Sequence, residues 1–116
     1  MSGELIAEGT GGSYGLPGQG FEVVEVRVRR LGGRYAAEGE WVQGANQGWI
    51  EEHHRLELAA VASDPFDAVR ELRCELERVG APTAETAEAC SGALVELAER
   101  FATQNGDLER ATVEAG

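Results

Sequence analysis

The fold is decided by residues 21–42, which read FEVVEVRVRRLGGRYAAEGEWV. Up to the glycine pair Gly32-Gly33, valines at positions 24, 26 and 28 alternate with charged residues. Alternation with a period of two predicts a strand with one buried face. The adjacent glycines tolerate the positive φ of a two-residue type I′ turn, so the chain is expected to fold back here as a β-hairpin.

The register of this hairpin follows from the turn. A two-residue turn pairs Leu31 with Arg34, so the numbers of paired residues add up to 65. One face then holds the pairs Val28–Ala37, Val26–Gly39 and Val24–Trp41, and the other face holds Arg27–Glu38 and Glu25–Glu40. A slip by one residue would turn the valines to water, so this register is strongly specified. Because glycine has no side chain to pack, Gly39 predicts a bulge or the close approach of another element.

A third strand is predicted after the polar connection at residues 43–48, QGANQG. It runs from Trp49 to Ala62, and its alternation sets one face of Ile50, His54, Leu56, Leu58 and Ala60. The segment 51–55 is strongly polar, so the strand proper is expected to begin near His54. A helix over residues 50–62 is the competing interpretation, since Glu, Leu and Ala favour helix. We favour the strand because an isolated hairpin is only marginally stable.

Two helices are predicted after these strands. Asp64-Pro65 supplies an N-cap acceptor and a proline at the first helical position, and Gly80 ends this helix before Pro82. A second helix begins at Thr83 and is expected to end at Asn105-Gly106. The apolar stripes are Phe66, Val69, Leu72, Leu76 and Val79 on the first helix, and Ala87, Cys90, Leu94, Leu97 and Phe101 on the second.

The predicted fold class is therefore α+β. An antiparallel three-stranded β-meander, with room for an extra N-terminal strand, packs against two C-terminal helices in the order β-β-β-α-α. Residues 9–20, GTGGSYGLPGQG, predict a loop, so residues 1–20 are expected to form a flexible glycine-rich arm. Residues 21–104 then form a single compact domain, and residues 105–116 form a short acidic C-terminal tail.

Charge excludes several functions. The chain has 21 acidic residues against 10 basic ones, and all the basic ones are arginine. Without lysine there is no Walker-type phosphate loop and no Schiff-base catalysis. The formal charge of −11 argues against a duplex nucleic-acid partner, which is bound by neutralising phosphates. Neither a membrane span of ~20 apolar residues nor a secretory signal is present in the sequence, so no membrane partner and a cytoplasmic location are expected.

The segment Glu51-Glu52-His53-His54 is the only cluster with the residue types of a metal or acid–base site. On a regular strand Glu51 and His53 share one face while Glu52 and His54 share the other, which leaves at most two ligands a side. The histidines are contiguous, whereas a helical zinc motif spaces them four apart. We therefore expect no metal, no cofactor and no catalytic residue. Cys74 and Cys90 lack zinc-site spacing and predict two buried, inert thiols, which are neighbours if the helices pack antiparallel.

Two aromatic residues are candidates for an interface, because aromatics dominate binding hot spots. Trp49 begins the third strand, and Tyr14 lies in the glycine-rich arm. Together with Glu51, His53 and His54 they form the predicted binding residues. If the third strand lies at a sheet edge, it also predicts a homodimer by edge pairing.

The element order over residues 21–79, with a helix that opens in SDPFDAVREL at residues 63–72, is similar to small antitoxin-like and double-stranded-RNA-binding-like layouts. The basic residues of an RNA-binding version are absent. The functional prediction is a small acidic, non-enzymatic binding protein with a basic protein partner, such as an inhibitor, an immunity or antitoxin-like protein, or an accessory subunit. The alternative is a small-ligand or metal-dependent enzyme that uses the Glu51–His54 cluster.

Overall fold

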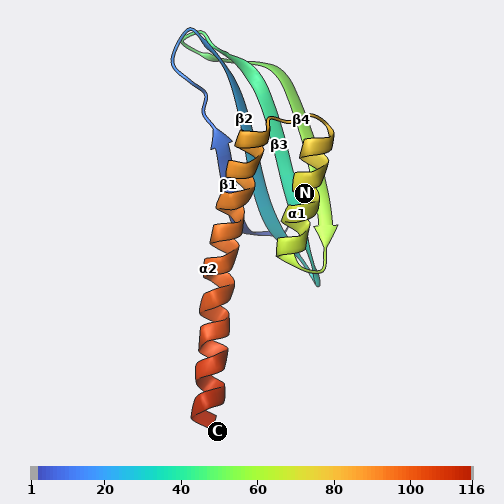
Figure 1. Ribbon diagram of the computed structural model, residues 1–116, viewed down its shortest axis with the longest axis vertical. Coiled ribbons are helices and arrows are strands. Elements are labelled where there is room, and N and C mark those ends of the chain that lie inside the picture. The colour runs from blue at the N-terminus through green and yellow to red at the C-terminus, as the bar shows by residue number, and fades with distance from the viewer. Residues whose placement is uncertain (1–2, 116) are drawn as a thin grey trace.

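A computed structural model describes the backbone of residues 3–115 and the side chains of residues 3–102. Four antiparallel strands form one sheet in the order β1-β2-β3-β4, and two helices follow (Figure 1). The elements are β1 (Glu4–Gly12), β2 (Gln19–Leu31), β3 (Arg34–Asn46), β4 (Ile50–Ala62), α1 (Pro65–Arg78) and α2 (Thr83–Ala115). The α+β prediction is confirmed, with the extra N-terminal strand present as β1.

The predicted hairpin is confirmed pair for pair. β2 and β3 pair from Leu31↔Arg34 onward in the register derived from the sequence. Gly32 has a φ of +61°, but Gly33 is not among the glycines with positive φ. The predicted type I′ turn, which needs positive φ at both residues, is therefore wrong, and the observed signs fit a type II′ turn. Val24, Val26 and Val28 are fully buried on the face that the helices cover, which we call the inner face. The opposite side is the outer face.

β4 is a strand over its whole length, so the helical alternative is wrong and the strand begins at Ile50 rather than near His54. A bulge at His53 breaks its register: Glu52 pairs with Gly44, but His54 pairs with Gln43. Glu52 and His54 therefore lie on opposite faces, and the predicted common face of Ile50 and His54 is also wrong. Gly44 permits the bulge, because a Cβ there would overlap the Glu51 carbonyl oxygen.

The glycine-rich segment is more ordered than the sequence predicted. Residues 9–12 belong to β1 and residues 19–20 to β2, so only residues 13–18 connect the two strands. Two glycines of β1 allow α2 to pack close to the strand. A Cβ on Gly11 would overlap the Glu85 carbonyl oxygen, and a Cβ on Gly9 would lie 2.6 Å from the Ala93 amide nitrogen. Side-chain absence, rather than backbone freedom, explains these glycines.

The helices cover only the inner face, α2 over β1 and β2 and α1 over β3 and β4 (Figure 1). Asp64 caps α1 as predicted and accepts hydrogen bonds from the amides of Phe66 at 2.8 Å and Asp67 at 3.1 Å. The predicted end of α2 at Asn105-Gly106 is wrong, because the helix runs to Ala115 and past the end of the sheet. An interior glycine costs only about 1 kcal/mol, which a continuous helix tolerates.

The core confirms one sequence prediction and corrects another. A Cβ on Gly39 would lie 3.1 Å from Leu72, so α1 does approach the sheet closely at this glycine. Cys90 is buried as predicted, but Cys74 is exposed, because it lies on the side of α1 turned away from the sheet centre. Both cysteines are free thiols.

Candidate binding surface at the loop end of the sheet

Two connections meet at the end of the sheet that extends past the helices, at the top of Figure 1. They are residues 13–18, between β1 and β2, and residues 47–49, between β3 and β4. The Gly18 amide donates to the Asn46 carbonyl at 2.5 Å, and the Asn46 side-chain amide donates to the Gly15 carbonyl at 3.1 Å. The same side chain accepts the Gly48 amide at 3.1 Å. Asn46 thus ties the two loops into one unit.

Besides Tyr14, which is 37% exposed, this loop end exposes three large apolar side chains to a greater extent. Leu16 is 69% exposed, Trp49 67% and Ile50 47%, and we call these three residues the apolar tip. Trp49, a predicted binding residue, is accessible for contact, whereas Leu16 and Ile50 were not among the predicted binding residues. The signal for Leu16 was its place in Leu16-Pro17-Gly18, a turn sequence that offers an apolar side chain no strand face to pack on. The signal for Ile50 was hidden by the bulge, which moves it off the inner face.

Tyr14 lies at the same end but has a different environment. Its ring packs edge-on against Phe21, with the ring centroids 4.9 Å apart. Phe21 forms a small buried cluster with Val23 and Val42 on the outer face. Partial burial, followed by the charge of Glu25, raises the pKa of the Tyr14 hydroxyl. Tyr14 is therefore part of the packing that holds its loop down on the sheet.

The Glu51–His54 segment sends its side chains to different partners. His53 Nε2 lies 3.8 Å from Glu51 Oε1, and both side chains are exposed. Glu52 instead accepts hydrogen bonds from Arg55, which lowers the pKa of the Glu52 carboxyl. His54 packs edge-on against Trp41, with centroids 6.2 Å apart. Within the described residues, no three His, Cys, Asp or Glu side chains are grouped so that they could hold a metal ion.

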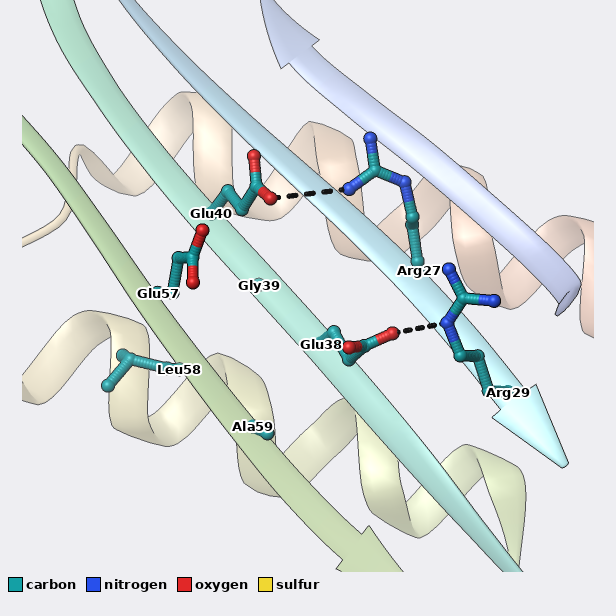
Figure 2. A pocket seen from close by; sticks show the side chains of 8 residues that line it. All are labelled: Arg27, Arg29, Glu38, Gly39, Glu40, Glu57, Leu58 and Ala59. Atoms are coloured by element: carbon teal, nitrogen blue, oxygen red, sulfur yellow. Dashed lines mark hydrogen bonds and ion pairs between the residues drawn. The ribbon is translucent and has the colours of Figure 1, made fainter. Parts of the chain in front are cut away.

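The outer face carries a ladder of ion pairs (Figure 2). Arg29 Nε donates to Glu38 at 2.5 Å, and Arg27 contacts Glu25 at 3.0 Å and Glu40 at 3.6 Å. Arg27 thereby bridges the like-charged pair that the hairpin register sets side by side. Glu38 pairs diagonally with Arg29, although its register partner is Arg27. These side chains line a hollow of about 430 Å³, and Glu57 stands at its β4 side (Figure 2).

Neither the family models, nor the curated proteins, nor the solved structures to which the chain was compared yield a match. In the helical parts that the structure describes, no stretch is both long and apolar enough to cross a membrane.

Proposed function

We propose that this chain is a non-enzymatic binding protein that docks a basic protein partner through the apolar tip. The observation that carries the proposal is the exposure of Leu16, Trp49 and Ile50 together at one end of the sheet. Isolated exposed apolar residues are common on any protein surface. Several large ones gathered on adjoining loops, with polar surroundings, are typical of an interaction site.

The loop geometry favours tight binding. Ordering flexible loops upon association reduces affinity, so a surface already fixed in place loses less. Here the loops are held by the Asn46 hydrogen bonds and by the packing of Tyr14 on Phe21. Tryptophan is among the residues that most often dominate an interface, which makes Trp49 the expected anchor.

Charge indicates the kind of partner. The chain carries an excess of 11 negative charges, and Glu51 and Glu52 lie directly beside the apolar tip. The outer-face arginines are already engaged, since Arg27, Arg29 and Arg55 each contact glutamates of this chain. The field around the tip is therefore negative, and such a field steers a basic surface toward it.

The same geometry gives less support to acid–base chemistry in the Glu51–His54 segment. His53 and Glu51 form an exposed pair at 3.8 Å, and the bulge separates Glu52 from His54. A general base needs a positioned proton partner in a site that limits water. Neither His53 nor Glu51 lies in such a setting, since their side chains are 57% and 50% exposed.

The test is affinity capture from the source cell with quantitative mass spectrometry. Three baits are compared: the unchanged chain, a Leu16→Ser/Trp49→Ser variant, and a Val95→Ser control. Val95 is 53% exposed on α2, so the control removes a comparable apolar side chain away from the tip. We expect basic proteins that are retained by the unchanged chain and the control but at least 10-fold depleted on the tip variant, as the loss of a hot-spot residue predicts.

Salt provides the second readout. Capture is repeated at about 0.05 M and 0.5 M NaCl, a range over which the screening length falls several-fold. Retention that weakens with salt supports charge steering. Capture by the tip variant equal to that by the unchanged chain would refute docking at the tip.

A further inference from the structure

The two edges of the sheet are treated differently by the rest of the chain. Along β1, amides that point away from the sheet are capped by α2: the Glu8 amide donates to Glu96 Oε2 at 3.0 Å, and the Gly12 amide to Glu88 Oε2 at 3.3 Å. The two capped amides are four residues apart on β1, and the two carboxylates are eight residues apart on α2. Both separations span roughly 12–13 Å, so each carboxylate lies opposite the amide that it accepts from. These two caps occupy edge amides that another strand would otherwise need for pairing.

The β4 edge has no such cover. Within residues 3–115, β4 pairs with β3 on one side and with no other strand on its far side. Among the side chains that the structure describes, we find no carboxylate cap on a β4 amide. The first part of β4 carries the bulge at His53 and two exposed glutamates, features that discourage pairing. From His54 to Ala62 the register is uninterrupted, and the exposed outer-face residues include Ala59 and Val61.

A groove runs beside this open stretch. It lies between β4 and α1 and has a volume of about 470 Å³. Small side chains form its apolar part, namely Ala59, Ala60 and Cys74, while Arg70, Glu71 and Glu75 of α1 also line it. An edge with free backbone groups beside a shallow apolar groove is the kind of site to which an extended strand is added.

We propose that the occupant of this edge is β4 of a second copy of the chain, paired antiparallel over His54–Ala62. The result is a continuous eight-stranded sheet with all helices on one side. The dimensions fit, because α1 lies over β3 and β4. Strands about 4.8 Å apart would then bring the two α1 axes to about 10 Å, within the usual range for packed helices.

Charge and the bulge together select the register. In an antiparallel pair, opposed residues lie on the same face of the sheet. The two-fold axis must therefore set one residue of β4 opposite the same residue of the second copy. An axis at Glu57 would set two carboxylates directly opposite each other, which is destabilising. An axis at Leu56 would set Arg55 opposite the partner's Glu57, but it would draw the His53 bulge into the ladder and leave Ala60–Ala62 without regular partners. An axis at Leu58 uses the whole of His54–Ala62 and avoids both problems.

The Leu58 axis makes two defined neighbours on the outer face. Glu57 comes opposite the partner's Ala59, and Arg55 comes opposite the partner's Val61. Arg55 has five N–H donors, and its bonds to Glu40 and Glu52 use three of them. It therefore keeps donors for a new acceptor across the edge. This dimer goes beyond the proposed function, because it leaves the apolar tip of each copy free.

The experiment measures the dimer dissociation constant by sedimentation velocity and light scattering for the full chain and four variants. Ala59→Arg and Val61→Glu should each add two symmetric opposite-charge pairs and tighten the dimer about 2- to 30-fold. Ala59→Glu and Val61→Arg should weaken it by a similar factor. Each position thus serves as the control for the other, since the favourable sign of charge is reversed between them.

The pattern of signs decides the outcome. General relief of the net negative charge would make arginine favourable at both positions, and that result would overturn the proposed pairing. A chain that remains monomeric up to millimolar concentration would overturn it too. Variants are compared only after their thermal unfolding midpoints show that the monomer fold is kept. The tip variant Leu16→Ser/Trp49→Ser should dimerise like the unchanged chain, which separates this proposal from the proposed function.

Discussion

The β1 and β4 edges of this sheet show two different ways to finish a strand. At β1 the helix α2 is seated so closely that glycines are required beneath it, and its carboxylates accept the edge amides. At β4 the helix α1 lies over the strand and leaves a groove along its border. An exposed edge is a template for another strand. The asymmetry therefore indicates that the β1 edge is protected by α2 and that the β4 edge is available for pairing with another strand.

Replacement of Gly11 by alanine tests the close seating of α2 and should have the largest effect. A Cβ at this position would overlap the Glu85 carbonyl oxygen, so helix and strand must move apart. We expect a loss of about 3 kcal/mol or more in the free energy of unfolding, measured by urea denaturation. Gly33→Ala is the matched control, because nothing lies within 4 Å of a Cβ there. Equal stability of the two variants would show that α2 is not seated on glycine.

Removal of the caps tests the β1 edge itself. Glu88→Ala and Glu96→Ala should each cost about 1 kcal/mol, the usual value of one hydrogen bond. Hydrogen exchange at the Gly12 and Glu8 amides should become faster in the corresponding variants. Glutamine at the same positions keeps an acceptor oxygen and should retain most of the protection. Exchange rates that are unchanged in the alanine variants would mean that the β1 edge is protected by something other than these carboxylates.

The sequence predicted the centre of the sheet well and its borders poorly. Between Phe21 and Val42, strand alternation and turn chemistry agree, so one register satisfies both. At β1 the glycines suggested mobility, because a single sequence does not reveal that another element needs the space beside Gly9 and Gly11. The bulge at His53 has a similar origin: it depends on Gly44 in the neighbouring strand. Contacts between distant segments decide these features, and periodicity within one segment does not report them.

The candidate site shows the same division. Trp49 follows a polar turn, and its exposure was predictable from that position. The pairing of its loop with residues 13–18 depends on the Asn46 hydrogen bonds, which join segments that the sequence separates by the whole β2–β3 hairpin. The sequence therefore does not show that Leu16 lies at the same end of the sheet as Trp49.

The two cysteines allow the solvent access of the α2 side and of the β4 edge to be compared. Cys90 of α2 is fully buried, and burial raises its pKa to about 11, whereas Cys74 of α1 is exposed beside the β4 groove. At pH 8 a maleimide should therefore label Cys74 in the native protein and reach Cys90 only after unfolding, as mass spectrometry of labelled peptides can verify. Labelling of both thiols at equal rates would show that the α2 side is not sealed.

The same thiol gives a pH dependence with a definite sign. In the unfolded chain Cys90 loses its proton near its ordinary pKa of 9.0, while in the folded chain it holds the proton up to about 11. Between these values the unfolded state binds fewer protons, so the contribution of Cys90 to stability falls as pH rises. The fall in unfolding free energy from pH 8.5 to 10.5 should therefore be smaller in Cys90→Ala than in Cys74→Ala. An equal fall in both variants would mean that Cys90 ionises in the folded state as freely as in the unfolded chain, which a closed α2 border does not allow.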